Sequence, residues 1–434
     1  MKTLGVDIGT TSVSAAVVEN GEVLSSRTLP NEAALPSECP WEKIQNPEVL
    51  KRTALSAVSD LAREYPDIEG IGVTGQMHGI LYHDAEGNAV SPLYTWQDGR
   101  GDLSFCPECS YASRLREITG YPVATGYGTV THFYNLQNGL VPENAAGFCT
   151  VHDWIAMNLC GGNVPLTDAT DAASLGLFDL RLGRFDEAAA EKAGFVPSFF
   201  PKLAKEPGIG RYREAIPVFA AIGDNQASFL GATGGARDAM LVNVGTGSQF
   251  SVFSPDFRPC PGLEIRPFPG EGWLLVGAPL CGGRAYALLE RFFRETVREF
   301  GGDPPADVYD AMGRILESPE PADLPTVLPL FQGTREDPTL RGRISGLSTE
   351  NFTPRHLIWA MLEGMTEELF GLYRNYRNGG GEDRPLTGSG NGLRKNRVLR
   401  DCVSRKFGQE LRMSGGMEEA ATGAALFAQS SLSL

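Results

Sequence analysis

The chain has 434 residues, of which 42% are hydrophobic and 21% are charged. That length is enough for two or three domains with sizeable cores, so a mini-protein and a disordered tail are both excluded. Acidic residues outnumber basic ones by 53 to 38, which gives a net charge of −15, and a surface of that sign repels nucleic acid and anionic membranes.

The sequence points to a soluble, cytoplasmic protein with no membrane partner. No stretch approaches the roughly 20 apolar residues that span a bilayer, and the first residues lead straight to Asp7, unlike a signal peptide. The eight cysteines are scattered, which fits reduced thiols better than a disulfide framework. Cys106 and Cys109 have the spacing of half a zinc site, but no second half follows.

The first 28 residues predict an antiparallel meander of three strands. Alternating apolar residues begin at Leu4, a second apolar run covers residues 13–18, and Asn20-Gly21 is a strong hairpin turn before the third run.

A helix is predicted from about Asn46, with Pro47 at its first position and apolar residues at helical spacing behind it. A buried strand is predicted over residues 68–74. Residues 99–170 are mixed and rich in glycine, and the sequence does not subdivide them.

The opening pattern returns in the second half. Residues 241–253 repeat the strand, Gly-Thr turn and strand of residues 4–14, which suggests a duplicated α/β unit. Small residues at 231–238 suit a hinge between the halves. Three longer helices are predicted in the second half, over residues 286–300, 354–376 and 393–407.

Each repeated hairpin carries a turn suited to a phosphate group. Thr10, Thr11 and Ser12 supply backbone N–H and hydroxyl donors, and the nearby carboxylate of Asp7 holds a divalent cation directly or through water. Gly245-Thr246-Gly247 is the second such turn. One such turn is common in ordinary hairpins, but two of them favour a polyphosphate ligand.

A third glycine-rich segment, Gly388-Ser389-Gly390-Asn391-Gly392, leads into a predicted helix and favours a nucleotide close to the backbone. The dinucleotide pattern and the P-loop pattern are both absent. The basic side chains of Arg394, Lys395, Arg397 and Arg400 are interpreted as a solvated helix face.

Asp224 follows an apolar run and a glycine, and Asn225 comes next. A carboxylate so placed suits the acceptance of a hydroxyl proton during transfer to phosphorus. Aspartate is also a favoured helix N-cap, and both interpretations stay open.

Two further segments carry groups that sugar sites use. The strand over 68–74 ends in a polar cluster that contains His78, although a single histidine is more often part of a core. Trp96 to Arg100 joins an aromatic face, a carboxylate and a guanidinium. A surface turn with an ion pair explains this second segment nearly as well.

Taken together, these segments resemble the FGGY family of carbohydrate kinases from Met1 to about Ala428. Asp7 to Ser12 is similar to the family's first phosphate motif, and Thr74 to Gly79 is similar to the substrate motif of its ketose kinases, including those of xylulose. Residues 71–79 and 388–396 look most like the kinases of sedoheptulose. The other pieces occur in the family's order: Trp96–Arg100, Gly223–Asn225, Gly245–Ser248, Leu330–Arg335 with Arg341-Gly342, Gly388–Asn391 and Ala421–Ala425.

The resemblance implies an α/β fold with the two-domain architecture of actin-like ATPases, made of duplicated ribonuclease H-like domains that close over a cleft. We expect the first domain over residues 1–233, with the sugar site and the first phosphate hairpin. The second is expected over residues 234–434, with the second hairpin and the adenosine site.

The same resemblance implies roles for single residues. Asp224 is expected to be the catalytic general base and Asp7 to hold Mg²⁺. The sugar is expected to contact Met77, His78, Asp224, Asn225, Trp96 and Arg100. ATP is expected to contact Thr10, Thr11, Ser12, Gly245, Thr246, Gly247, Gly390 and Asn391.

The implied activity is the ATP-dependent phosphorylation of a ketose hydroxyl, with sedoheptulose converted to sedoheptulose 7-phosphate as the leading expectation. The alternatives are a kinase for another ketose or polyol, such as xylulose, ribulose or glycerol, and a non-catalytic actin-like protein that binds nucleotide. The expected partners are a sugar and ATP. The oligomeric state stays open, with a homodimer as one option.

Overall fold

The computed structural model describes residues 1–334, 337, 339–416 and 418–433. The chain divides into two compact units. The first unit comprises residues 1–236, 266–272 and 416–434, and the second comprises residues 237–265 and 273–415. Arg335, the last residue of one predicted motif, lies outside the described residues.

The first unit is built on a seven-stranded sheet. Its strands are β1 (Lys2–Ile8), β2 (Ser12–Glu19), β3 (Glu22–Pro30), β5 (Gly70–Gly75), β15 (Gly208–Tyr212), β16 (Ile216–Phe219) and β17 (Ile222–Gly223). They follow the order β15-β16-β5-β1-β2-β3, with β17 beside β5. The predicted meander of β1, β2 and β3 is confirmed, and Asn20 and Gly21 adopt positive φ angles of 52° and 82° in its turn.

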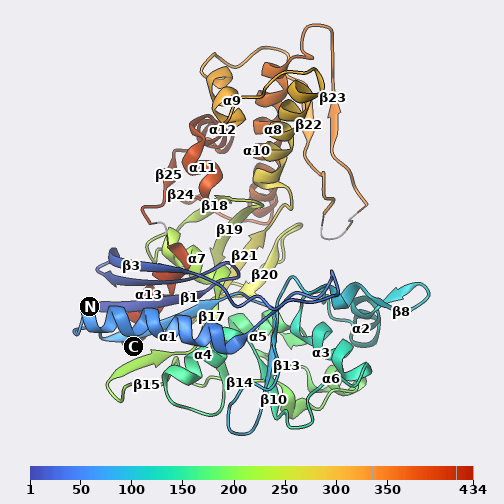
Figure 1. The fold of residues 1–434 in the computed structure, drawn as a ribbon. Coiled ribbons are helices and arrows are strands. Elements are labelled where there is room, and N and C mark those ends of the chain that lie inside the picture. Colours follow the sequence, from blue (N-terminus) through green and yellow to red (C-terminus); the bar gives the residue numbers. More distant parts are fainter. Residues whose placement is uncertain (335–336, 338, 417, 434) are drawn as a thin grey trace. The chain divides into compact units, whose positions relative to one another are not determined.

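Helices α1 (Pro47–Glu64) and α4 (Val151–Leu159) lie on one face of this sheet (Figure 1). Asn46 caps α1 as predicted, because its side chain accepts hydrogen bonds from the N–H groups of the first turn. The apolar stripe of α1 packs on Leu4, Val6 and Ile8, which point to this face of the sheet.

Helices α7 (Asp224–Ala232) and α13 (Glu419–Leu432) lie against the opposite face. A Cβ atom at Gly5 would lie 1.8 Å from the carbonyl oxygen of Ala421, and one at Gly72 would lie 1.9 Å from that of Ala424. Glycine is therefore required at both positions, because the backbone of α13 rests directly on β1 and β5.

The rest of the first unit forms a smaller α/β region with its own aromatic-rich core. It includes the segment over 99–170 that the sequence did not subdivide, apart from α4. Its elements are β4 (Ile44–Gln45), β6 (Leu81–His83), β7 (Leu93–Tyr94), η1 (Gly99–Asp102), β8 (Ser104–Cys106), β9 (Cys109–Ser110), α2 (Tyr111–Thr119), α3 (Gly128–Gln137), β10 (Gly147–Cys149), β11 (Leu166–Thr167), α5 (Ala169–Leu175), β12 (Phe178–Asp179), β13 (Arg184–Phe185), α6 (Glu187–Lys192), η2 (Pro197–Phe199) and β14 (Lys202–Leu203).

The sheet of the second unit repeats the path of the first. Its strands are β18 (Met240–Val244), β19 (Ser248–Ser254), β20 (Glu264–Pro267), β21 (Trp273–Gly277), β24 (Leu386–Ser389) and β25 (Leu411–Met413), and β22 (Thr326–Leu328) pairs separately with β23 (Arg343–Ser345). The order β21-β19-β18-β24-β25 matches β3-β2-β1-β5-β16 strand for strand. The predicted duplication is therefore confirmed in both sheets.

The helices of the second unit are α8 (Gly282–Glu299), α9 (Val308–Leu316), α10 (Pro354–Asn378), α11 (Asn391–Lys395) and α12 (Arg397–Phe407). Thr353 caps α10, as its place before Pro354 predicts. The single helix predicted over 393–407 is wrong, because Asn396 leaves the helical conformation and its side chain caps α12.

The units differ from the predicted domains of 1–233 and 234–434 at the boundary, which lies after residue 236, and at two later segments. Residues 266–272 and 416–434 belong to the first unit, although they follow the start of the second. The later segment contains α13, and its close packing on Gly5 and Gly72 is the physical reason.

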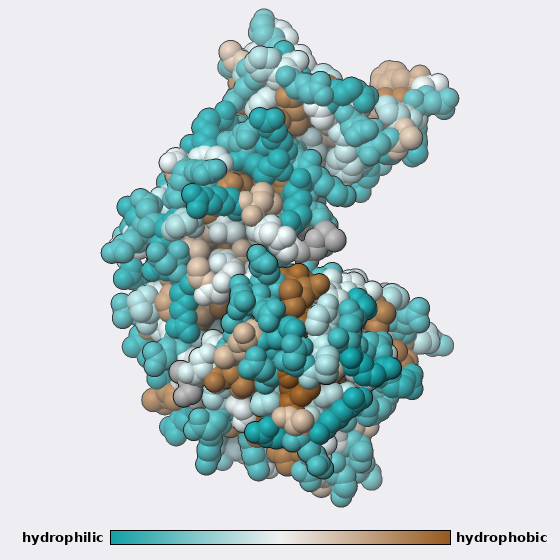
Figure 2. Space-filling model, turned by 90° about the vertical axis from the view of Figure 1, so that its left-hand side faces the viewer, coloured by the Kyte–Doolittle hydropathy of each residue, from teal (hydrophilic) through white to brown (hydrophobic). Residues whose placement is uncertain are grey.

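The face shown in Figure 2 is mostly hydrophilic, and its hydrophobic residues form small groups. Among the described residues, no helix is both long enough and apolar enough to cross a bilayer. All eight cysteines are free thiols. Cys106 and Cys109 are backbone partners on the neighbouring strands β8 and β9, and their thiols are not joined.

Buried carboxylates are an unusual feature of the first unit. Asp153 and Asp171 are fully buried on α4 and α5. Burial and the charge of Asp171 raise the pKa of Asp153 to about 8, and burial raises the pKa of Asp171 well above its usual value. Burial therefore favours the neutral acid form of both side chains.

The close approach of α13 predicts that Gly72→Ala is strongly destabilising. The added Cβ atom meets the backbone of α13, so we expect the free energy of unfolding to fall by about 1–3 kcal/mol or more. Gly371→Ala in α10 is the control, because its Cβ atom meets open space and alanine favours a helix. Urea denaturation measures both, and equal stabilities would contradict the packing.

The neutral state of Asp153 predicts a pH effect. The unfolded chain releases this proton near pH 4, whereas the folded protein keeps it up to about pH 8. Each unit of rising pH between these values therefore costs folding about 1.4 kcal/mol from this group. As the pH rises from 5 to 8, the free energy of unfolding of Asp153→Asn should increase relative to that of the unmodified protein. Urea denaturation at each pH measures both. If the two free energies change with pH in the same way, the prediction is refuted.

Candidate active site

Asp7 and Asp224 come together at one edge of the first unit's sheet. Asp7 lies near the end of β1, and Asp224 is the first residue of α7. Burial, followed by repulsion from Asp224 and Glu418, raises the pKa of Asp7 to about 7. The carboxylates of Asp7 and Asp224 are therefore close enough for their repulsion to raise the pKa of Asp7.

The side chain of Asp224 does not cap its helix. Gly223 occupies the cap position, and no side chain makes the capping hydrogen bond, so the N-cap interpretation of Asp224 is wrong. Its Oδ1 accepts a hydrogen bond from Asn225 Nδ2 at 3.1 Å instead. Burial raises the pKa of Asp224, while His152 and Arg266 act to lower it. This half-buried carboxylate is available to a ligand proton.

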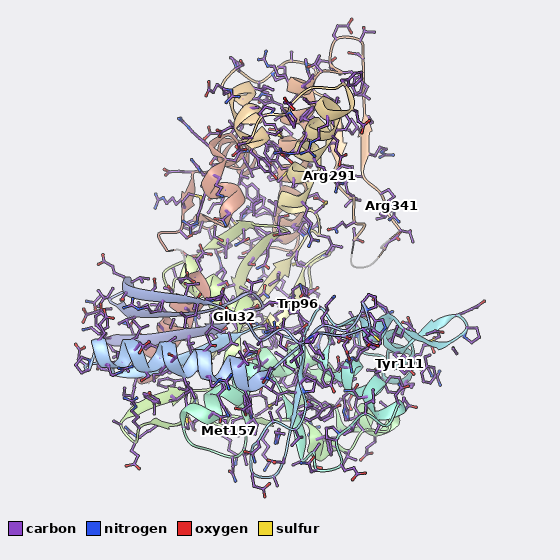
Figure 3. The ribbon with its side chains drawn as sticks, viewed as in Figure 1. Glu32, Trp96, Tyr111, Met157, Arg291 and Arg341 are labelled. Carbon is purple, nitrogen blue, oxygen red and sulfur yellow. The ribbon has the colours of Figure 1, made fainter. Side chains whose placement is uncertain are left out.

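The first phosphate turn is held by side chains from neighbouring segments. Asn31 Nδ2 donates to the carbonyl oxygens of Gly9 and Thr10 at 3.0 Å, and Gln45 Nε2 donates to that of Thr10 at 3.1 Å. Trp96 (Figure 3) donates its indole N–H to Thr10 Oγ1 at 2.9 Å. The hydroxyl hydrogen of Thr10 is therefore left for a ligand. The turn's other predicted donors are the exposed Thr11 and the half-buried Ser12.

Met77 and Asn225, both predicted to contact the sugar, contact each other. Asn225 Nδ2 lies 3.6 Å from the sulfur atom of Met77. A Cβ atom at Gly223 would lie 2.7 Å from Met77 Cε. Glycine before Asp224 is thus what lets Met77 approach.

His78 is half-buried and has an uncommon backbone conformation. Its φ angle is 74°, in the left-handed region that side chains other than glycine seldom adopt. Its Nδ1 lies 2.7 Å from the carbonyl oxygen of Ser174, and its ring stacks on Tyr127 with the centroids 4.5 Å apart. Strain of this kind clusters at ligand sites, so the structure favours the ligand interpretation over the core histidine.

The prediction that Arg100 contacts the sugar needs correction. Its side chain is buried, with Nε 2.6 Å from Asp98 Oδ1 and its other nitrogens bonded to Asn135, Glu42 and Asp98. Its guanidinium also lies over the ring of Tyr94. The ion pair is therefore internal, and Arg100 supports the loop that carries Trp96, which is 46% exposed.

The sequence analysis missed a buried pair beneath this region. His152 Nε2 lies 2.9 Å from Asp171 Oδ2, and both side chains are fully buried. A Cβ atom at Gly75 would lie 3.0 Å from His152, which places the imidazole under the end of β5. The available signal was the run His152-Asp153 inside an otherwise apolar helix.

The second phosphate turn packs against the start of α8. The N–H of Gly283 donates to the carbonyl oxygen of Gly245 at 3.1 Å, and that of Arg284 donates to Thr246 at 3.0 Å. A Cβ atom at Gly282 would lie 2.1 Å from the backbone of Gly247. The pair Gly282-Gly283, which the sequence analysis did not single out, permits this contact.

Beside this turn the second unit contains a cavity of about 1500 Å³. Gly245, Thr246, Gly390 and Asn391 line it, together with residues of α8, α9, α10 and α12. Gly390 has a φ angle of 87°, and a Cβ atom there would lie 2.5 Å from the carbonyl oxygen of Val244. Four of the residues predicted to bind ATP therefore face one cavity large enough for a nucleotide.

The interpretation of the basic run as a solvated face is only partly right. Lys395 and Arg397 are exposed and line the cavity. Arg394 bonds to Ser414, and Arg400 donates to the carbonyl oxygens of Leu393 and Arg394. Arg394 and Arg400 thus hold α11 and α12 in place.

The residues around Asp7 fit a magnesium ion. In the described part of the chain, no three metal-ligating side chains gather closely enough to bind a metal by themselves. Mg²⁺ commonly needs only one or two carboxylates, with water and substrate phosphates as its other ligands. The mutual repulsion around Asp7 is the kind that a divalent cation relieves.

Comparison with known proteins agrees with this geometry. Residues 2–231 match the FGGY family of carbohydrate kinases, N-terminal domain. Sedoheptulokinase of Mus musculus is 31% identical over 93% of this chain and 92% of its own length, and that of Homo sapiens is 30% identical over 98% and 96%.

The solved structure of xylulose kinase from Rhodospirillum rubrum has a TM-score of 0.84, with 23% identity over 99% of this chain and 90% of that chain. This likeness shows the fold, and the predicted actin-like architecture is confirmed. With the family match over more than half of the residues, the chain belongs to the FGGY family of carbohydrate kinases and is an ATP-dependent carbohydrate kinase.

Proposed function

We propose that this kinase phosphorylates a ketose hydroxyl, that sedoheptulose is the substrate, and that sedoheptulose 7-phosphate is the product. The observation that carries the proposal is the position of Asp224 at the start of α7, without a capping role and beside Asn225 and Met77. A carboxylate there suits removal of the proton from an attacking hydroxyl.

The electrostatics of the first unit suit a general base. A base works best when its pKa is near the operating pH, and burial moves the pKa of Asp224 upward from its usual value. The opposing effects of His152 and Arg266 favour the ionised form that accepts a proton. Met77 and His78 would hold the sugar next to this carboxylate.

The cavity of the second unit is the proposed site of ATP. Gly390 and Asn391 would line the adenosine, and Gly245, Thr246 and Gly247 would donate to the phosphates. In the first unit, Thr10, Thr11 and Ser12 would donate to the transferred group. Magnesium bound at Asp7 would neutralise charge on the phosphates and keep them in position.

The choice of sedoheptulose rests on the two sedoheptulokinases, which align over nearly the whole chain at 31% and 30% identity. Another ketose or a polyol stays the alternative, because small changes around Met77 and His78 would alter the sugar. The non-catalytic alternative is abandoned, since the family is one of kinases. The homodimer stays a prediction.

Replacing the proposed base tests the mechanism. Asp224→Asn keeps the shape but removes the proton acceptor, so we expect kcat to fall by about 10²–10⁴-fold while ATP affinity, measured by calorimetry, stays within about threefold. Asp60→Asn on the exposed face of α1 is the control. Near-normal turnover by Asp224→Asn would show that another group is the base.

A substrate panel tests the sugar. ADP release should be measured with ATP, Mg²⁺ and sedoheptulose, xylulose, ribulose, gluconate or glycerol, each over a range of concentrations. We expect the highest kcat/KM with sedoheptulose, because transition-state contacts set this ratio. A higher value for any other compound would assign that compound as the substrate instead.

A further inference from the structure

We propose that Thr74 and Thr170 are positioning residues for Asp224, and that their hydroxyl groups hold the peptide between Ile222 and Gly223 from both sides. The proposal rests on the role of Asp224 as general base. It adds two residues, from β5 and α5, that do not touch the substrate.

Two hydrogen bonds, which together we call the clamp, hold both edges of one peptide. Thr74 Oγ1 donates to the carbonyl oxygen of Ile222 at 2.6 Å. The N–H of Gly223 donates to Thr170 Oγ1 at 3.1 Å. Both groups belong to the same planar peptide unit, so the two bonds together fix the orientation of that plane.

Burial makes both hydrogen bonds hard to replace. Thr74 and Thr170 are 0% and 1% exposed, so water does not readily substitute for either hydroxyl. The N–H of Thr170 also donates to Asp168 Oδ1 at 2.8 Å, which fixes the first turn of α5 and with it the position of this hydroxyl. The hydroxyl oxygen of Thr170 thus accepts from Gly223 through a lone pair.

The clamped peptide lies one residue before Asp224. β17 pairs with β5 so that Ile222 faces Thr74 and Gly223 faces Gly75. β5 ends at Gly75, two residues before Met77, which contacts Asn225. Rotation of the peptide plane would thus swing Asp224 relative to the side chains that hold the sugar, and a misplacement of about 1 Å can cost a hundredfold in rate.

The test removes one hydroxyl at a time. Thr170→Val keeps the shape and removes the acceptor, so we expect kcat with the sugar to fall by about ten- to a hundredfold, with KM for ATP unchanged. Thr170→Ser restores the hydroxyl and should recover most of kcat. Hydrogen exchange of the segment containing Gly223 should become faster in Thr170→Val and return towards the original rate in Thr170→Ser.

Thr3→Val is the matched control. Thr3 is also fully buried in the first unit, and its hydroxyl donates to the carbonyl oxygen of Ala425 at 2.8 Å. It lies at the opposite end of β1 from Asp7. We expect this variant to lose stability without a specific loss of kcat or faster exchange at Gly223.

The outcomes distinguish a failure of the clamp proposal from a failure of the proposed function. Unchanged exchange at Gly223 in Thr170→Val would overturn the clamp, and faster exchange with kcat equal to that of Thr3→Val would overturn the positioning role. If Thr170→Val does not fold, Thr74→Val carries the same expectations. Normal turnover by Asp224→Asn would instead overturn the general base, whatever the threonine variants show.

Discussion

The contact on which the first unit most depends is the backbone packing of α13 against β1, β5 and α7. Besides Gly5 and Gly72 in the sheet, Gly231 and Gly423 leave no room for a side chain: their Cβ atoms would lie 1.9 Å and 1.7 Å from carbonyl oxygens of the facing helix. This packing fixes α7, which begins with Asp224, and it brings Glu418, at the start of α13, beside Asp7. The carboxylates of Asp7 and Asp224 thus owe their positions to residues that have no side chain.

The same region concentrates buried acidic side chains in a protein that is already acidic. Asp7, Asp153, Asp171 and Asp224 all have raised pKa values, with burial as the largest cause. The burial of these carboxylates therefore destabilises the folded state around the site. Such a cost is typical of functional sites, where charges are placed for chemistry rather than stability. The binding of an anionic nucleotide then depends on local donors and a cation, because the overall field opposes it.

Local features were predictable from the sequence because local residues cause them. The Asn20-Gly21 turn, the Asn46 cap and the repeated hairpin are each determined by a few neighbouring residues, and all are found in the structure. The burial of Arg100, the pair of His152 with Asp171 and the return of α13 depend on contacts between residues far apart in sequence. Periodicity and motif spacing do not predict such long-range contacts. Even the end of a helix at Asn396 was missed, since its capping role competes with an apolar pattern that continues past it.

The return of the last helix to the first unit also affects how the protein is made. During synthesis, residues 1–236 leave the ribosome long before α13, and the whole second unit is translated in between. Until then, the glycine-lined face of the first sheet lacks α13 and exposes backbone and apolar surface, the condition in which nascent chains aggregate or engage chaperones. The second unit, whose segments all precede residue 416, has no such delay. The unit that carries Asp7 and Asp224 is thus translated in separate parts, with most of the second unit between them.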